Sequence, residues 1–118
     1  MATGSDVAVR NMMLQAIKDW NPGSVGTTIK IGAYTTDSDV SVITTANATY
    51  GTPSSSTMNI TSNVVLNIGA GGSVAHLRIQ KGDYPSNHTI YKKDITAEVF
   101  TFAGTITITS ASITIADA

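Results

Sequence analysis

The pattern of hydrophobic and polar positions changes its period once along the chain, near residue 27. Between Val7 and Trp20, apolar residues recur at steps of three and four, which predicts an amphipathic helix. Asp6 is placed to cap its first turn, and Asn21-Pro22-Gly23 ends it because proline cannot continue a helix. We expect the apolar stripe to pack on the domain's own sheet or, as the alternative, on a neighbouring subunit. The stripe consists of Val9, Met12, Met13, Ala16, Ile17 and Trp20.

From Thr27 onward, apolar residues alternate with polar ones, which is the period of half-buried strands. Turn-forming residues follow about every ten positions, and segment 49–56 reads as a loop because it carries glycine, proline and three serines. Strands are predicted at 27–34, 40–46, 57–60, 63–68, 73–80, 88–94 and 98–102, with a C-terminal hairpin at 105–116.

Two of these segments carry sharper expectations. In strand 73–80, one face is apolar, and the other is polar and holds His76, Arg78 and Gln80. In the hairpin, two pairs of isoleucines face each other across Ser110. The pairs are Ile106 and Ile108 on one strand, and Ile113 and Ile115 on the other.

Many short strands with regular turns are typical of an all-β domain rather than of a parallel sheet with crossover helices. We therefore predict a mainly β fold, an antiparallel and jelly-roll-like β-sandwich of about eight strands with one N-terminal α-helix. A chain of 118 residues has the size of a single domain. Residues 1–6 are predicted to be a flexible arm, and residues 7–118 one domain that includes the helix at 7–20.

Composition narrows the classes of function. Charged residues make up 13% of the chain, against about 25% in ordinary proteins, while serine and threonine supply about a quarter. Neutral hydroxyls are easier to desolvate than ions, so such a surface suits contact with proteins or sugars. The alternative is that threonine is simply a good strand residue. The net charge of −1 has no like-charged block, which argues against a nucleic-acid partner.

The chain has no cysteine, which excludes disulfides and thiolate metal sites. No apolar run approaches the roughly 20 residues that span a bilayer, and the first residues lack the features of a signal peptide. We therefore expect no membrane partner and folding in a cytoplasm. The two histidines, His76 and His88, and the one glutamate, Glu98, lie in no catalytic or metal-binding motif. We expect no enzyme activity, no catalytic residue, no metal and no cofactor.

Three segments together give the chain a distinctive order: VRNMMLQAI at 9–17, IKIGAY at 29–34 and GSVAHLRI at 72–79, followed by a Thr/Ile-rich end. This order resembles that of a family of small virion structural proteins of tailed bacteriophages. The resemblance covers about half of the chain. The sequence departs from the family pattern after Tyr34, where Thr35-Thr36-Asp37 stands in place of an early glycine.

The resemblance implies a non-enzymatic capsid decoration, or cement, protein that stabilises the head lattice. The alternative is a tail accessory protein or a receptor- or glycan-binding β-sandwich module. The implied partners are the major capsid protein or other virion proteins and further copies of the chain, with a trimer as one state that no residue here specifies. The implied location is the virion, after assembly in the host cytoplasm.

The residues expected at such an interface lie in the arm, in two loops and, if it does not pack internally, in the apolar stripe of the helix. Loop tyrosines anchor protein interfaces and also stack on sugars, and ordinary loop packing is the third alternative for both. The expected interface residues are Ala2, Thr3, Gly4, Ser5, Asp6, Tyr50 and Tyr84.

Overall fold

The computed structural model of the chain describes residues 7–21 and 26–114. Within these residues, one α-helix precedes eight strands, and every strand pair is antiparallel. The predicted mainly β class with one N-terminal helix and antiparallel sheets is confirmed. The elements are α1 (Val7–Asp19), β1 (Ile29–Tyr34), the 3₁₀ helix η2 (Asp39–Ser41), β2 (Val42–Ala48), β3 (Thr57–Met58), β4 (Val64–Ile68), β5 (Ser73–Lys81), β6 (His88–Val99), β7 (Gly104–Ile108) and β8 (Ile113–Thr114).

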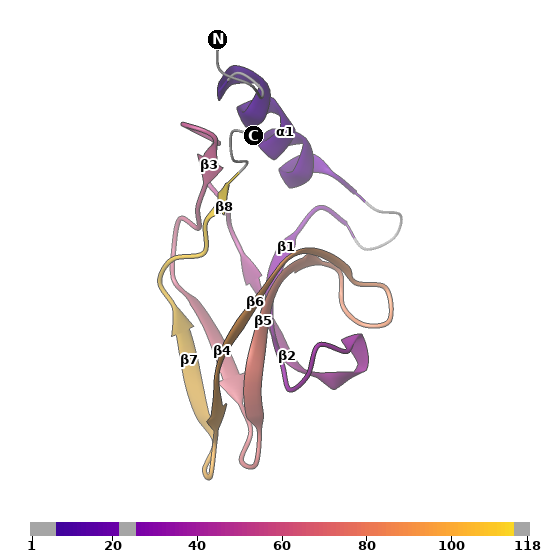
Figure 1. Cartoon of the computed structure of the whole chain (residues 1–118), viewed down its shortest axis with the longest axis vertical. Helices are drawn as coiled ribbons and strands as arrows, with labels where there is room; N and C mark the ends of the chain where they lie inside the picture. Colours follow the sequence, from indigo (N-terminus) through magenta and orange to yellow (C-terminus); the bar gives the residue numbers. More distant parts are fainter. Residues whose placement is uncertain (1–6, 22–25, 115–118) are drawn as a thin grey trace.

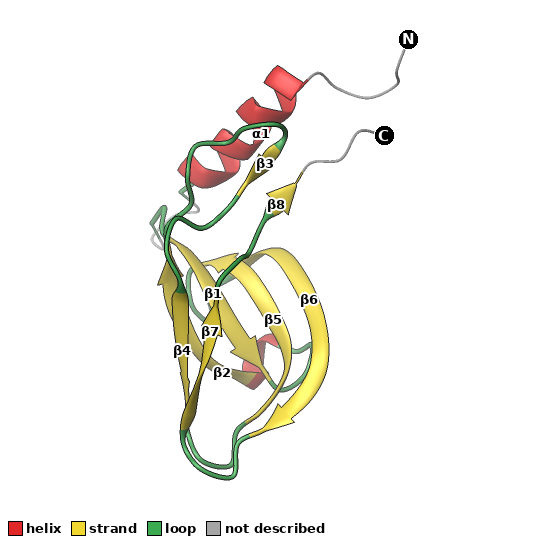
Figure 2. Ribbon diagram, turned by 90° about the vertical axis from the view of Figure 1, so that its left-hand side faces the viewer, coloured by secondary structure: helices red, strands yellow, loops and turns green. Residues whose placement is uncertain are grey.

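The strands form one sheet of four strands and two sheets of two strands (Figure 1). The order in the large sheet is β2-β1-β5-β6, and the small sheets are β4-β7 and β3-β8. Figure 2 shows the large sheet curving so that its inner face looks toward β4 and β7. Because side chains alternate along a strand, every second residue of β1 and β4 enters one buried apolar cluster. These residues are Ile29, Ile31, Ala33, Val64, Leu66 and Ile68.

Strand β5 is buried on both of its faces at its C-terminal end. The sequence placed Arg78 and Gln80 on a polar face, but their exposed fractions are 1% and 0%. The segment that follows β1 covers this face, where Asp37 and Asp39 contact the guanidinium of Arg78. Arg78 does lie on the face opposite Leu77 and Ile79, but alternation along a strand does not reveal which loops cover that face.

The hairpin predicted at 105–116 is wrong. β7 pairs with β4 and places Ile106 opposite Leu66, whereas β8 pairs with β3 and places Ile113 opposite Met58. Residues 115–118 lie outside the described residues. The two Ile/Thr segments therefore belong to different sheets and do not face each other.

Side chains hold the segment that connects β7 to β8. The Tyr50 hydroxyl donates to the carbonyl oxygen of Ala111 at 2.7 Å, and the Ala111 N–H donates to Asn59 Oδ1 at 2.9 Å. Both backbone groups of Ala111 therefore have partners outside any strand ladder. These contacts let the chain leave β4 and cross to β3 without unmade hydrogen bonds at Ala111.

The strand predicted at 88–94 and the first two residues of the one predicted at 98–102 belong to the single strand β6, and residues 100–102 lie outside it. Strand β6 pairs with β5 from end to end, with irregular register between Val74 and His76 and between Ile79 and Gln80. No glycine or proline lies between Asp94 and Glu98, so the chain has no turn signal there. The irregular steps absorb the extra residues within one strand.

The inner face of β4 can be tested by substituting two adjacent residues. Leu66 is fully buried and Val65 is 47% exposed. We expect Leu66→Ala to lower the free energy of unfolding by about 2–5 kcal/mol, because it leaves a cavity in the core. Val65→Ala should change it by less than about 0.5 kcal/mol. Urea denaturation measures both values, and equal losses would contradict this orientation of β4.

Candidate functional site

Helix α1 turns a different face to the protein body from the one that the sequence predicted. Leu14 is fully buried and Arg10 is 8% exposed, while half-buried Ile17 packs on the core cluster. These three residues recur at i, i+4 and i+7 and form a stripe beside the predicted one. The prediction that the apolar stripe packs on the domain's own sheet is therefore wrong for every member except Ile17.

The other five members of the predicted stripe are exposed, and we call them the helix face. At about 100° per residue they fall within one sector of about 100° around the helix. Met12 is the most open, with an exposed fraction of 71%. Figure 1 places α1 at one end of the molecule, beyond the four-stranded sheet. The helix face consists of Val9, Met12, Met13, Ala16 and Trp20.

A buried lysine holds the C-terminal end of α1. Lys81, the last residue of β5, is fully buried, and its Nζ donates to the carbonyl oxygens of Lys18, at 2.8 Å, and Trp20. Carbonyl groups at a helix C-terminus lack partners within the helix and carry its negative end. Burial lowers the pKa of Lys81, and nearby Asp19 opposes this shift. The ammonium thus ties the helix end to the sheet.

Hydrogen bonds also hold the N-terminal half of α1. Arg10 Nε donates to Ser56 Oγ at 2.7 Å, and the backbone N–H of Ser56 donates to Asn11 Oδ1 at 2.9 Å. Ser56 adopts a φ of 63°, a left-handed conformation that is uncommon for residues with a side chain. Together with the Lys81 contacts, these bonds fix the rotation of the helix and leave its apolar face outward.

The helix face gathers four large exposed apolar side chains, those of Val9, Met12, Met13 and Trp20, on one helix. Monomeric proteins rarely keep extended apolar patches on their surface, and those present usually mark a binding site. Methionine side chains suit such a role because they are flexible and polarisable. Trp20 is anchored at one edge, where its ring meets the His88 ring at 5.2 Å and 73°, and it still exposes 45% of its surface. The helix face can therefore pack against an apolar partner.

The structure separates the two tyrosines that the sequence grouped together. Tyr84 is 47% exposed, in the turn between β5 and β6 and before the cis peptide bond to Pro85. Tyr50 is only 3% exposed and binds Ala111, and its burial raises the pKa of its hydroxyl. Tyr50 is a packed residue and not an interface residue, because its ring fills the core. The expected contacts at Ala2, Thr3, Gly4, Ser5 and Asp6 lie outside the described residues.

An aromatic and a cation stack on the outer face of the large sheet. The Arg78 guanidinium lies 4.2 Å from the centre of the Tyr34 ring, and the Tyr34 hydroxyl donates to Gln80 Oε1. Burial raises the pKa of Tyr34. A Cβ at Gly32 would lie 2.8 Å from the Tyr34 ring, so only glycine leaves room for this stack.

Charges around this stack are paired within the chain. Arg78 contacts Asp39 and Asp37, and Lys92 binds Asp37 at 3.0 Å. The hydrogen bond from Lys92 lowers the pKa of Asp37, and the hydrogen bond from Arg78 lowers the pKa of Asp39. We call these two cations and two carboxylates the outer network. Their charges neutralise one another, and their contacts hold loop 35–41 on the sheet.

Among the described residues, no group of three or more histidine, cysteine or acidic side chains is arranged so that it could hold a metal ion. His76, which the sequence placed on the polar face of its strand, binds Asp94 at 2.7 Å. His88 instead packs on Trp20.

Comparisons with known proteins returned no match to a protein-family model, a curated protein or a solved structure. Among the described residues, no helix has both the length and the apolar character needed to cross a membrane.

The Lys81 contact can be tested against a lysine that lacks partners. We expect Lys81→Met to lower the free energy of unfolding by about 1–3 kcal/mol, because the carbonyls of Lys18 and Trp20 lose their donor. Lys93 has no hydrogen bond or ion pair in the described part of the chain, so Lys93→Met should change it by less than about 0.5 kcal/mol. Urea denaturation followed by circular dichroism compares them, and equal effects would show that Lys81 does not hold α1.

Low pH should destabilise the protein, because it protonates carboxylates that are paired in the folded state. The pKa values of Asp37, Asp39 and Asp83 are all lowered by hydrogen bonds, in the last case from Lys30 and Thr45. A carboxyl with a lowered folded pKa contributes stability above its ordinary pKa, about 3.9, and loses it as the pH falls through the folded value. We expect the urea concentration at the midpoint of unfolding to decrease as the pH is lowered below about 4. The decrease should be less steep in the double variant Asp37→Asn/Asp39→Asn. Parallel curves for the two proteins would contradict a role for these carboxylates.

Proposed function

We propose that this chain is a non-enzymatic structural protein of a tailed-bacteriophage virion, which decorates the capsid and stabilises the head lattice. The observation that carries the proposal is the exposed helix face at one end of the molecule. Polar contacts at both ends of α1 hold this face outward, so its exposure is built into the fold. A fixed apolar face is suited to a partner that already has a complementary surface.

The surface chemistry supports repeated protein contacts. Few residues carry charge, and the serine and threonine hydroxyls are readily desolvated. The fixed orientation of α1 also supports this role, because a preorganised face loses little conformational freedom on binding. The resemblance of the three sequence segments to small phage virion proteins supplies the identity of the particle.

A cement protein stabilises the shell because its binding is coupled to capsid assembly. A subunit that bridges neighbouring capsid proteins binds the assembled shell and not the free subunits, so it stabilises the shell. Many weak contacts act together when copies of the chain are held close to one another on the lattice. The major capsid protein is the proposed partner of the helix face, and self-association of the chain would add contacts between neighbouring copies.

We propose an antiparallel, jelly-roll-like β-sandwich as the finer description of the fold. Two observations support it: all strand pairs are antiparallel, and β1 of the large sheet shares one core with β4 of the small sheet. Such a domain exposes its loops and its helix at the ends of the sheets, where a lattice contact forms without disturbing the core.

One observation favours the second candidate, a tail accessory or a receptor- or glycan-binding module. Tyr84 exposes about half of its surface on the turn between β5 and β6, where a ring can stack on a sugar. Glycan binding that disappears in Tyr84→Ala would favour this module over the cement protein.

Location and binding are tested on phage particles from a lysate that contains the protein. Immunogold labelling should place the protein over the heads. Gold confined to the tail would favour the accessory protein, and unlabelled particles would exclude a virion protein.

Co-sedimentation with particles stripped of the protein tests the helix face. We expect Met12→Ser/Met13→Ser to bind at least tenfold more weakly, because burial of each side chain contributes about 1.5–3 kcal/mol. Val40→Ser is the matched control, since Val40 is 67% exposed in η2, and should bind normally. Normal binding by the methionine variant would contradict the proposed role of this face.

A further inference from the structure

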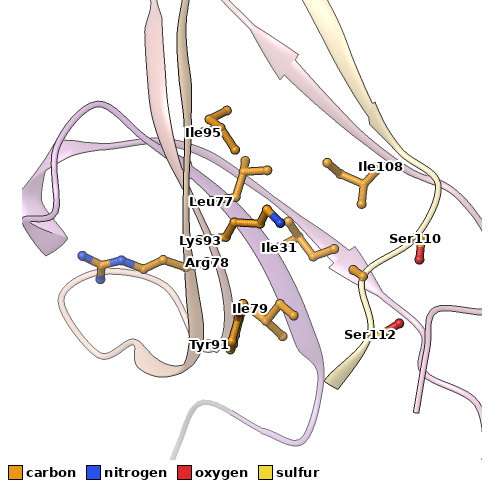
Figure 3. A pocket seen from close by; sticks show the side chains of 11 residues that line it. Ile31, Leu77, Arg78, Ile79, Tyr91, Lys93, Ile95, Ile108, Ser110 and Ser112 are labelled. Carbon is orange, nitrogen blue, oxygen red and sulfur yellow. The ribbon is translucent and has the colours of Figure 1, made fainter. Parts of the chain in front are cut away.

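A cleft opens between the large sheet and the end of β7. Its volume is about 410 Å³, which lies within the range of about 300–1,000 Å³ for small-molecule sites. Figure 3 shows side chains of β1, β5 and β6 on one side and those of β7 and the following segment on the other. Its apolar wall consists of Ile31, Leu77, Ile79, Ile95 and Ile108.

The cleft exists because two consecutive strands do not pair. β6 is bonded only to β5, and β7 only to β4, within the described strands. Figure 2 shows the ribbons of β6 and β7 diverging from the loop that joins them, and the cleft lies between the large sheet and the end of β7. Of its lining residues, Ile31 and Ile79 are buried, with exposed fractions of 2% and 7%, whereas Tyr91 and Lys93 of β6 are exposed.

One cation enters this apolar space. The Lys93 side chain points into the cleft, and Figure 3 places its amine beside Ile31. It makes no hydrogen bond or ion pair with the rest of the described chain. Arg78 is the other basic residue of the lining, but its guanidinium points away from the cleft, toward the outer network. Ser110, Ala111 and Ser112 line the opposite wall, and the hydroxyl groups of the two serines point away from Lys93.

We propose that this cleft binds an amphiphilic carboxylate, with its hydrocarbon chain between the two sheets and its carboxylate at Lys93. An apolar molecule alone would bring the ammonium into a drier site without a partner, which is unfavourable. A single carboxylate supplies the opposite charge and accepts hydrogen bonds from the ammonium. This inference goes beyond the proposed function and does not depend on it, because the cleft and the helix face share no residue.

Decanoate is a suitable probe, with decanol as the uncharged comparison. In a titration followed by ¹H–¹⁵N NMR, decanoate should shift the amide signals of Leu77, Ile79 and Ile108 and should bind more tightly than decanol. Lys93→Gln should weaken decanoate binding about threefold to fivefold, as expected for a partly exposed ion pair, and leave decanol unchanged. Met12→Ser/Met13→Ser should bind both probes normally.

Three outcomes would overturn the proposal. Equal affinity for decanoate and decanol would show that Lys93 does not recognise the head group. Shifts confined to Met12 and Met13 would move the probe to the helix face. Shifts at the cleft that grow with protein concentration alone would identify its occupant as a second copy of the chain. Normal capsid binding by Lys93→Gln would leave the proposed virion role intact in every case.

Discussion

The buried ammonium of Lys81 is the contact on which the placement of α1 depends. A buried charge is unfavourable unless its hydrogen bonds are made, and carbonyl groups at the C-terminal end of α1 and just beyond it provide the acceptors. This requirement holds the helix end over the end of β5, while Arg10 and Ser56 hold the other half of the helix. With both halves tied, Leu14 enters the core and the apolar face beside it stays outward. The surface that we propose for assembly is thus a consequence of a polar contact.

Strand β5 joins this contact to the other features of the molecule. Three residues near its C-terminal end contact three parts of the molecule. Arg78 holds loop 35–41 on the outer face, Ile79 lines the cleft on the inner face, and Lys81 holds the helix. A slip of one residue in its pairing with β1 would exchange the two faces. The stack of Arg78 on Tyr34 opposes such a slip, because it fits only above Gly32. The register of one strand therefore positions both the helix face and the cleft.

Alternation of apolar residues was enough to predict β1, β4 and β5, because an apolar residue stands at every second position of each. It failed at 105–116, since two Ile/Thr segments look alike whether they pair with each other or with distant strands. The anchors of the helix, Arg10 and Lys81, are buried cations that composition would place on the surface. Lys81 donates to backbone carbonyls and Arg10 to the Ser56 hydroxyl, both distant in sequence, so the direction of α1 depends on tertiary contacts. The only local signal was the spacing of Arg10, Leu14 and Ile17.

Methionine oxidation provides the most direct test of the helix face as an assembly surface. Free protein and protein on intact particles would be exposed to the same dose of hydrogen peroxide, and each methionine followed by mass spectrometry. Met12, at 71% exposure, should oxidise readily in the free protein and much more slowly on particles, as should Met13. Met58, at 2%, is the buried reference that should stay slow in both. Equal oxidation of Met12 and Met13 in the two states would contradict the account.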